Sequence, residues 1–126
     1  MRILLDSHVV LWWLEGNITL GSKTRQLIEG ADEAFVSSVT PWELGIKRAL
    51  GKLSMPEGLV DVLESDGFKS LPITATHAEL APALPPFHRD PFDRMLVSQA
   101  QLDTLVLVTG DRALASYDVE QFDARS

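Results

Sequence analysis

The sequence predicts an α/β fold in which a central, mostly parallel sheet of four to five strands is flanked by helices. Short apolar runs alternate along the chain with longer segments of helical spacing, which is typical of strand–helix–strand units. The run from Leu105 to Val108 is apolar at every position, as expected of a strand buried on both faces. With 126 residues the chain can build one ordinary core, and we expect residues 1–126 to form a single domain.

The first half of the chain is expected to supply two strands and three helices. Glycine readily adopts the left-handed conformation that follows a helix, and Gly16, Gly30 and Gly51 are expected to end the three helices. Ser22 is expected to cap the second helix through its hydroxyl group. In chain order the expected elements are a strand at Arg2–Asp6, helices at Ser7–Glu15 and Ser22–Glu29, a strand at Glu33–Ser38 and a helix at Thr40–Leu50.

The second half is expected to contain four helices and two or three strands. Three prolines between Pro82 and Arg89 predict an irregular loop, because proline lacks a backbone N–H and fixes φ. We expect an edge strand at Glu120–Phe122 and a tendency of the chain to fray from Glu120 onwards. The other expected elements are a helix at Glu57–Ser65, a strand at Phe68–Ile73, helices at Thr76–Leu80 and Pro91–Leu102, a strand at Leu105–Thr109 and a short helix at Arg112–Ser116.

The composition excludes several classes of protein. Hydrophobic residues make up 45% and charged residues 23% of the chain, which is ordinary globular usage. There is no cysteine, which excludes disulfides and thiolate zinc sites, so any metal should be bound through oxygen. The longest apolar run, Val9–Leu14, is too short to span a bilayer, and we expect a cytoplasmic protein without an export signal.

The net charge of −7 argues against a general basic coat for nucleic acid. A local basic rim is still compatible with it, because the bases are partly grouped along the chain. The candidates for such a rim are Lys47, Arg48, Lys52, Arg89, Arg94 and Arg112.

Four acids, Asp6, Glu43, Asp93 and Asp111, each stand where an apolar strand or loop gives way to a helix. In a parallel sheet these transitions lie along one edge, so we expect the four carboxylates to converge in one cleft. Grouped carboxylates repel one another unless a cation lies between them. Mg²⁺ prefers a few carboxylates with water and substrate phosphate, and Mn²⁺ would accept the same ligands.

Each of these acids also has a purely structural interpretation as a helix cap. Thr40 and Glu43 have the spacing of a capping box, and Asp90 can cap the helix that contains Asp93. Asp6 and Asp111 can likewise cap the helices that follow them. Taken together, the acids favour a metal site, since Asp90 and Asp93 supply more than one cap requires.

The chain resembles the PIN-domain toxins of the VapC type from bacterial toxin–antitoxin pairs. The likeness is carried, in order, by "ILLDSHVVLWWL", "SSVTPWELGIKRALGKL", "HRDPFDRMLVSQA" and "LVTGDRAL", and it covers nearly the whole chain. It implies a three-layer PIN-like fold and a Mg²⁺-dependent endoribonuclease that hydrolyses RNA phosphodiesters with a metal-activated water. It also implies a cognate antitoxin as partner and a homodimer.

The same resemblance assigns the metal-binding and catalytic acids to Asp6, Glu43, Asp93 and Asp111. Asp93 is preferred to Asp90 because it directly precedes "RMLVSQA". The hydroxyl of Thr109 matches a position that supports the site. The alternatives are a noncatalytic PIN-like module that binds protein or RNA, and another Mg²⁺-dependent enzyme of phosphate transfer.

Three further features have both a functional and a structural interpretation. His88 and Arg89 can contact RNA phosphate or lie in a solvated loop, whereas His8 and His77 are expected to be ordinary helix residues. Lys47 is expected to pair with Glu43 across one helical turn. The apolar run Val9–Leu14 is either buried in the domain or covered by a partner.

Overall fold

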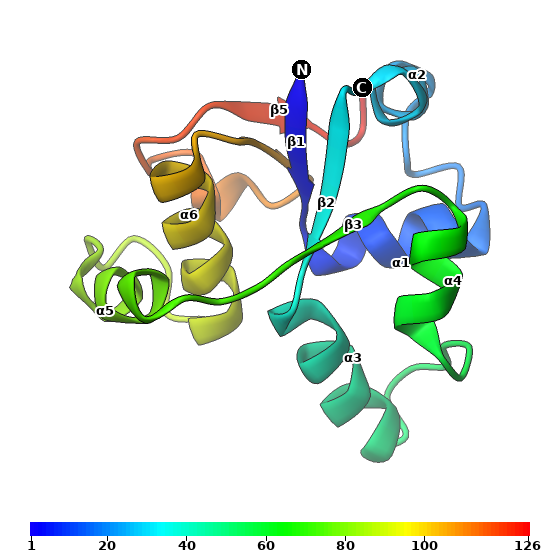
Figure 1. Cartoon of the computed structure of the whole chain (residues 1–126), viewed down its shortest axis with the longest axis horizontal. Coiled ribbons are helices and arrows are strands. Elements are labelled where there is room, and N and C mark those ends of the chain that lie inside the picture. The colour runs from blue at the N-terminus through cyan, green and yellow to red at the C-terminus, as the bar shows by residue number, and fades with distance from the viewer.

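The structure, a computed structural model, describes all 126 residues and contains five strands and six α-helices (Figure 1). The strands are β1 (Arg2–Leu5), β2 (Glu33–Ser37), β3 (Lys69–Leu71), β4 (Val106–Thr109) and β5 (Gln121–Asp123). The helices are α1 (Ser7–Glu15), α2 (Ser22–Gly30), α3 (Val39–Ala49), α4 (Leu59–Ser65), α5 (Ala75–Ala83) and α6 (Pro91–Asp103), with a 3₁₀ turn, η1, at Arg112–Leu114. None of the helices is both long enough and apolar enough to cross a lipid bilayer.

The five strands form one sheet in the order β3-β2-β1-β4-β5, and every neighbouring pair is parallel. The predicted α/β class with a mostly parallel sheet of four to five strands is therefore confirmed. β1 lies in the centre, where Leu5 is in register with Val36 of β2 and Val108 of β4. The chain builds β2 and β3 on one side of β1 and β4 and β5 on the other, so the topological switch falls between β1 and β4.

Helices cover both faces of the sheet, giving the three layers that the resemblance implied (Figure 1). Side chains alternate between the two faces along each central strand, so Ile3 and Leu5 face one core while Leu4 faces the other. The first core packs against α1, α2 and α4, and the second against α5 and α6. Burial on both faces explains why the central strands read as unbroken apolar runs.

The apolar run at Val9–Leu14 lies in α1 and is largely explained by the first core. Val9 and Val10 are buried, and Leu11 to Leu14 are partly buried against the same cluster. The Trp13 ring packs edge-on against Phe68 at 5.5 Å between centroids, and its indole N–H donates to Asp66. Burial within the domain therefore accounts for most of this run.

The end of the chain is held in place, so the expected fraying from Glu120 onwards is wrong, whereas the predicted edge strand is confirmed as β5. The prediction that Ser22 caps α2 is wrong, because the cap position is Gly21 and no side chain bonds there. The N–H groups of Gly21 and Thr24, which have no partner within the helix, donate to the carbonyls of Ala124 and Ser126 at 3.0 and 3.1 Å and so hold the end of the chain in place. The buried Thr24 hydroxyl also lies within 3.3 Å of three carbonyls of this segment.

The segment after α5 is shorter than predicted, because α5 continues through Pro82 to Ala83. Proline removes only the bond to the Ala78 carbonyl, which the last turn of a helix tolerates. The remaining loop is tied down by Arg94, whose guanidinium donates to the carbonyls of Pro82, Leu84, Pro85 and His88 at 2.8–3.2 Å. It also lies 3.2 Å from the Tyr117 hydroxyl. Arg94 was a candidate for the RNA-binding rim, but its donors are consumed by the loop.

We expect Arg94→Met to lower the free energy of unfolding by about 2 kcal/mol, because several loop carbonyls lose their donor while the aliphatic stem is kept. Urea denaturation would measure this change. Arg112→Met is the matched control, since the Arg112 guanidinium makes no hydrogen bond or ion pair, and it should change the midpoint little. Equal effects of the two substitutions would contradict the clamp role of Arg94.

Candidate functional site

The carboxyl ends of β1 and β4 bring Asp6 and Thr109 into contact at the switch point. The Asp6 N–H donates to the Val108 carbonyl at 3.0 Å, which extends the β1–β4 pairing by one residue. One carboxylate oxygen of Asp6, Oδ1, accepts from the Val9 N–H at 2.9 Å and so caps α1. The other, Oδ2, accepts from the Thr109 hydroxyl, and both side chains are buried. The supporting position predicted for Thr109 thus agrees with its contact.

Asp111 is joined to the same pair through Thr109. Its N–H donates to Thr109 Oγ1 at 3.0 Å, which fixes the turn after β4. Its Oδ1 accepts from the Ala113 N–H at 2.9 Å and caps the 3₁₀ turn, while Oδ2 lies 3.0 Å from His88 Nε2. In Asp6 and Asp111 alike, one oxygen serves the backbone and the other points into the site.

Glu43 reaches the site from α3, but not as the capping-box residue considered from the sequence. The helix begins at Val39 with Ser38 at the cap position, so Thr40 lies inside it and the capping box is wrong. The Glu43 carboxylate is buried and accepts from the Ser7 hydroxyl at 2.7 Å and from Lys47 at 3.0 Å. The intrahelical ion pair with Lys47 is confirmed. Tertiary contact with α1, rather than local capping, sets the position of this carboxylate.

At the start of α6, Asp90 caps the helix and Asp93 faces the acid cluster. Asp90 is the cap, because its Oδ1 accepts from the N–H groups of Phe92 and Asp93 at 2.8 and 3.3 Å. The Asp93 carboxylate caps nothing, and its Oδ2 lies 3.3 Å from His88 Nε2. The structure therefore places Asp93, as expected, on the side of the acid cluster.

The electrostatics show that the acids have converged. Burial and, to a smaller extent, the charges of Asp90, Asp6 and Glu43 together raise the pKa of Asp93 to about 7, and His88 opposes the change. Burial also raises the pKa of the Asp6 carboxyl; the Thr109 hydrogen bond lowers it, and the nearby Asp111 charge adds a smaller increase. The charges of Asp6 and Glu43 thus act on Asp93, and the charge of Asp111 acts on Asp6, which indicates that the four predicted acids lie near one another.

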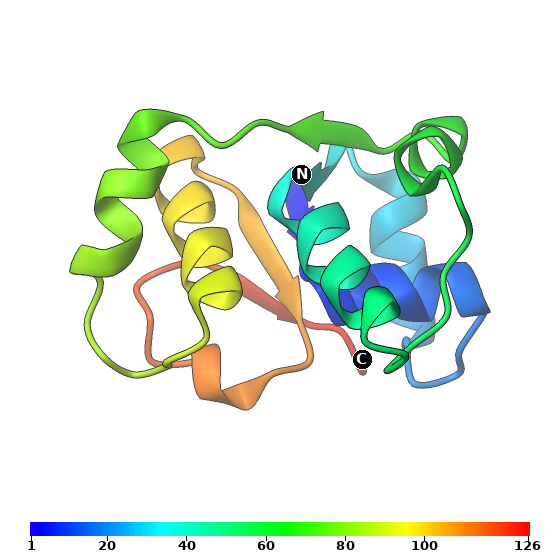
Figure 2. The ribbon, with the colours of Figure 1, turned by 90° about the horizontal axis from the view of Figure 1, so that it is seen from below.

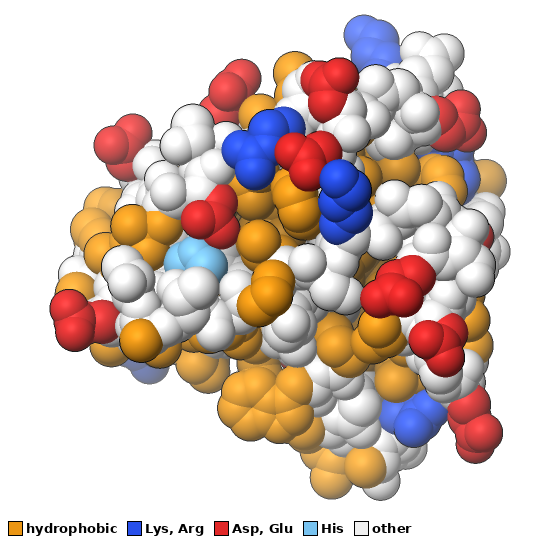
Figure 3. Space-filling view, in the orientation of Figure 1, with side chains coloured by type: hydrophobic (Ala, Val, Ile, Leu, Met, Phe, Trp, Pro, Cys, Tyr) orange, Lys and Arg blue, Asp and Glu red, His pale blue; other side chains and the backbone are white.

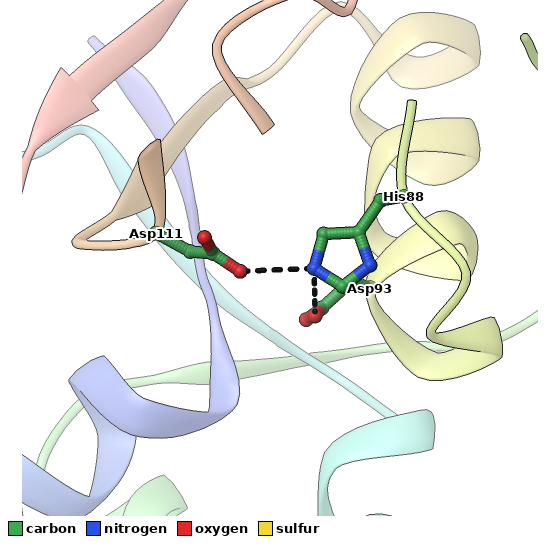
Figure 4. A group of neighbouring side chains, drawn as sticks. All are labelled: His88, Asp93 and Asp111. Carbon is green, nitrogen blue, oxygen red and sulfur yellow. Dashed lines mark hydrogen bonds and ion pairs between the residues drawn. The ribbon is translucent and has the colours of Figure 1, made fainter. Parts of the chain in front are cut away.

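His88 contacts the acids themselves, whereas the sequence left open a contact with RNA phosphate or a solvated loop. Its Nδ1 accepts from the Asp90 N–H at 3.0 Å, which assigns the ring proton to Nε2. Nε2 then donates toward Asp111 and Asp93, as drawn in Figure 4. The position of His88 two residues before a helix cap was the available signal. His77 lies elsewhere, buried in α5 and 3.1 Å from Asp103.

The donor set fits a hard divalent cation. Asp6, Glu43, Asp93 and Asp111 offer carboxylate oxygens, the ligands that Mg²⁺ and Mn²⁺ prefer. The only lysine or arginine paired with any of them is Lys47 on Glu43. One donor atom each from His88, Asp93 and Asp111 lies within 4.8 Å of the other two, although His88 presents an N–H there rather than a lone pair.

The four acids are carried by the start of α1, by α3, by the start of α6 and by the turn before η1. These segments meet at the carboxyl edge of the sheet, as Figure 2 shows. An all-parallel α/β sheet with acids gathered at its switch point defines a class of protein whose ligands bind at this edge of the sheet. Residues 3–120 match the PIN domain family model. The chain belongs to the PIN domain family.

Individual relatives agree with this assignment. Ribonuclease VapC22 of Mycobacterium tuberculosis is 36% identical over 123 residues, covering 91% of each chain, and confirms the resemblance to the VapC type. Two solved structures share the fold: VapBC2 of Rickettsia felis bound to a promoter DNA fragment (TM-score 0.72, 14% identity, 98% of both chains) and FitAcB of Neisseria gonorrhoeae (TM-score 0.68, 18% identity, 98% of both chains).

We expect the metal-free protein to lose stability as the pH rises from about 4 to 7. The folded pKa of Asp93 is about 7 against an ordinary value of 3.8, so in this window the unfolded chain ionises while the folded one keeps its proton. Asp93→Asn removes this penalty and should be more stable than the wild type by about 2 kcal/mol at pH 8, with little difference at pH 4.

Urea denaturation in the presence of EDTA at both pH values would measure this difference. Asp118→Asn, a change at an exposed aspartate without a side-chain partner, should show no such pH-dependent gain. If Asp93→Asn is no more stable than the wild type at pH 8, the prediction that ionisation of Asp93 destabilises the folded protein is contradicted.

Proposed function

We propose that this protein is a cytoplasmic, Mg²⁺-dependent endoribonuclease that acts as the toxin of a toxin–antitoxin pair, with residues 1–126 as one PIN-like domain. The observation that carries the proposal is the convergence of Asp6, Glu43, Asp93 and Asp111 at the switch point with a single cationic partner among them. Support comes from the 36% identical relative, which is named a ribonuclease. The cytoplasm is where an RNA substrate would be met.

The four acids would hold one or two Mg²⁺ ions, and Mn²⁺ would be accepted in their place. When bound, the cation supplies Lewis acidity, activating water for attack on a phosphodiester and offsetting charge on the phosphate. The protein's own contribution is orientation. The Thr109 hydroxyl holds Asp6, the Ser7 hydroxyl and Lys47 hold Glu43, and the Asp111 cap fixes its side chain.

Asp93 differs from the other acids because its carboxylate has no backbone or hydroxyl donor. Its raised pKa means that it is ready to exchange a proton for a cation near neutral pH. His88 donates an N–H toward Asp93 and Asp111, which reduces their mutual repulsion while no cation is bound. This arrangement supports a site that is folded before the cation arrives.

Two alternatives are disfavoured by the same geometry. A noncatalytic module with acids as helix caps does not explain Glu43 and Asp93, whose carboxylates cap nothing. A phosphatase of the haloacid dehalogenase kind would need a second aspartate two residues after Asp6, and that position is His8.

We also propose two protein partners, a cognate antitoxin and a second copy of the chain. The antitoxin is supported by the structural neighbours, among them a toxin–antitoxin complex from Klebsiella pneumoniae (TM-score 0.67, 18% identity, 93% of both chains). The homodimer is supported by an apolar cavity of about 370 Å³ between α3, α5 and α6, where Trp42 is 63% exposed. Figure 3 shows hydrophobic side chains gathered at the end of the molecule where α3 lies.

We expect purified protein to cleave single-stranded RNA in the presence of Mg²⁺ or Mn²⁺ and to leave 5′-phosphate and 3′-hydroxyl ends. Asp93→Asn should reduce the rate by about 100-fold or more, because it removes a carboxylate proposed to hold the cation. Asp90→Asn is the matched control, since asparagine caps a helix as well as aspartate does, and it should retain most of the activity.

Calorimetric titration with Mn²⁺ supplies a readout that does not depend on the choice of RNA. Binding should be present in the wild type and strongly weakened in Glu43→Gln. Unchanged binding in Glu43→Gln, together with no cleavage of any RNA, would favour the noncatalytic module.

We expect the protein to sediment as a dimer and Trp42→Glu to shift it toward monomer, because a charge is placed in the apolar face. Ile18→Glu, at a side chain that is 95% exposed outside this face, should leave the dimer intact. Sedimentation velocity of the two variants would decide the point, and a Trp42→Glu dimer as stable as the wild type would exclude this interface.

A further inference from the structure

We propose that Arg125 binds a phosphate group of the RNA substrate next to the acid cluster and so positions the RNA chain for cleavage. The inference rests on the proposed ribonuclease function and adds a residue that neither the four acids nor the predicted basic rim includes. Arg125 would act as a positioning residue, holding a phosphate other than the one attacked.

The first observation is the cavity in which Arg125 lies. It measures about 250 Å³ and opens directly over two of the proposed metal-binding acids. Its lining consists of Asp6, His8, Trp12, Gly110, Asp111 and Arg125. Arg125 is the only lysine or arginine of this cavity. An RNA strand that reaches the acids through this opening must therefore pass the guanidinium group.

The second observation is that Arg125 is held but not neutralised. Its guanidinium carbon lies 5.2 Å from the centroid of the Trp12 ring, in a cation–π contact, and Nη1 donates to the Gly110 carbonyl. No carboxylate forms a salt bridge with it, although Asp6 and Asp111 line the same cavity. The remaining N–H donors of the planar group are free to bind two oxygens of a phosphate.

The third observation is that the surrounding backbone is built for this close approach. A Cβ atom on Gly110 would lie 2.6 Å from Arg125 Nη1 and 3.0 Å from the Trp12 ring, so a larger residue there would displace the guanidinium group. Arg125 itself follows β5 and the buried Ala124, in the segment that is bonded to α2 through Thr24. A side chain on a tail that was free to move would lose more entropy on binding phosphate.

None of the other basic side chains lines this cavity, and several are occupied elsewhere. Lys47 is paired with Glu43, and Arg2 and Lys69 are both paired with Glu33. Arg94 clamps a loop, while Arg89 and Arg112 line different cavities. Arg125 is therefore the cation best placed to contact a strand bound at the acids.

The cavity favours RNA over an acidic protein segment as the ligand of Arg125. Two of its six lining residues are aspartates, which repel any anion unless a cation is bound between them, as the proposed cleavage of RNA requires. It also contains the rings of His8 and Trp12, 6.4 Å apart between centroids, which offer faces for stacking of a base.

The test compares Arg125→Gln and Arg125→Lys with Arg2→Gln, the same neutralisation of an exposed arginine at the opposite end of β1 from Asp6. Steady-state cleavage of a fluorescent single-stranded RNA should show KM raised about tenfold in Arg125→Gln, with kcat changed much less, and an intermediate KM in Arg125→Lys. Binding of the same RNA is measured in the Asp93→Asn protein with and without Arg125→Gln. The added substitution should weaken binding about tenfold and reduce the slope of the logarithm of the binding constant against the logarithm of the salt concentration by about one.

Thermal melting of each variant shows whether a change in KM reflects loss of folded protein. If Arg125→Gln melts early, Arg125→Lys, which retains the positive charge, is used for the comparison. Wild-type protein that neither cleaves nor binds RNA would overturn both the proposed function and this inference. Cleavage by the wild type with equal KM values for Arg125→Gln and Arg2→Gln would overturn this inference alone. A polyglutamate peptide that binds the wild type but not Arg125→Gln, with RNA binding unchanged, would assign the cavity to an acidic protein and also overturn it.

Discussion

The pairing of β1 with β4 is the constraint on which the rest of the site depends. These strands are adjacent in space but separated by about a hundred residues of chain, and the Asp6 N–H continues their ladder by donating to Val108. Because parallel strands in register end together, the side chains of Asp6 and Thr109 must meet. The helices that carry Glu43 and Asp93 begin at the same edge, so the acids are gathered by the topology rather than by attraction for one another.

A fold that gathers carboxylates also has to tolerate them. Burial raises the pKa values of Asp6 and Asp93, which means that the folded state is less stable when they ionise. The protein offsets part of this cost with neutral donors, the hydroxyls of Thr109 and Ser7 and the ring N–H of His88, and with one ammonium group on Lys47. Neutral donors orient a carboxylate without cancelling its charge, so the site remains attractive to a cation.

Much of this arrangement could be predicted from the sequence, since it follows from short-range patterns. An acid at or soon after the end of an apolar strand indicates the strand end, as at Asp6 and Asp111, and the spacing of Asp90 and Asp93 indicates a cap at Asp90. The choice of Asp93 for the site came from the resemblance to the PIN-domain toxins. What failed depends on contacts between distant segments. The Thr40–Glu43 pattern resembles a capping box, but the hydroxyl of Ser7 on another helix binds Glu43 instead. The roles of Arg94, His88 and Arg125 likewise depend on irregular segments whose paths no periodicity reveals.

The division of labour between the two oxygens of Asp6, and of Asp111, has a consequence for the design of inactive variants. In each residue Oδ1 caps a helix and Oδ2 points into the site. An asparagine there would keep its carbonyl oxygen on the cap, which forces its amide NH₂ group to replace Oδ2. Such a protein would keep the cap but set an NH₂ group against the Thr109 hydroxyl or the His88 N–H, both of which donate to the carboxylate. It would present hydrogen-bond donors at the positions where a cation requires acceptors, so the site would lose the cation while the helix starts remain in place.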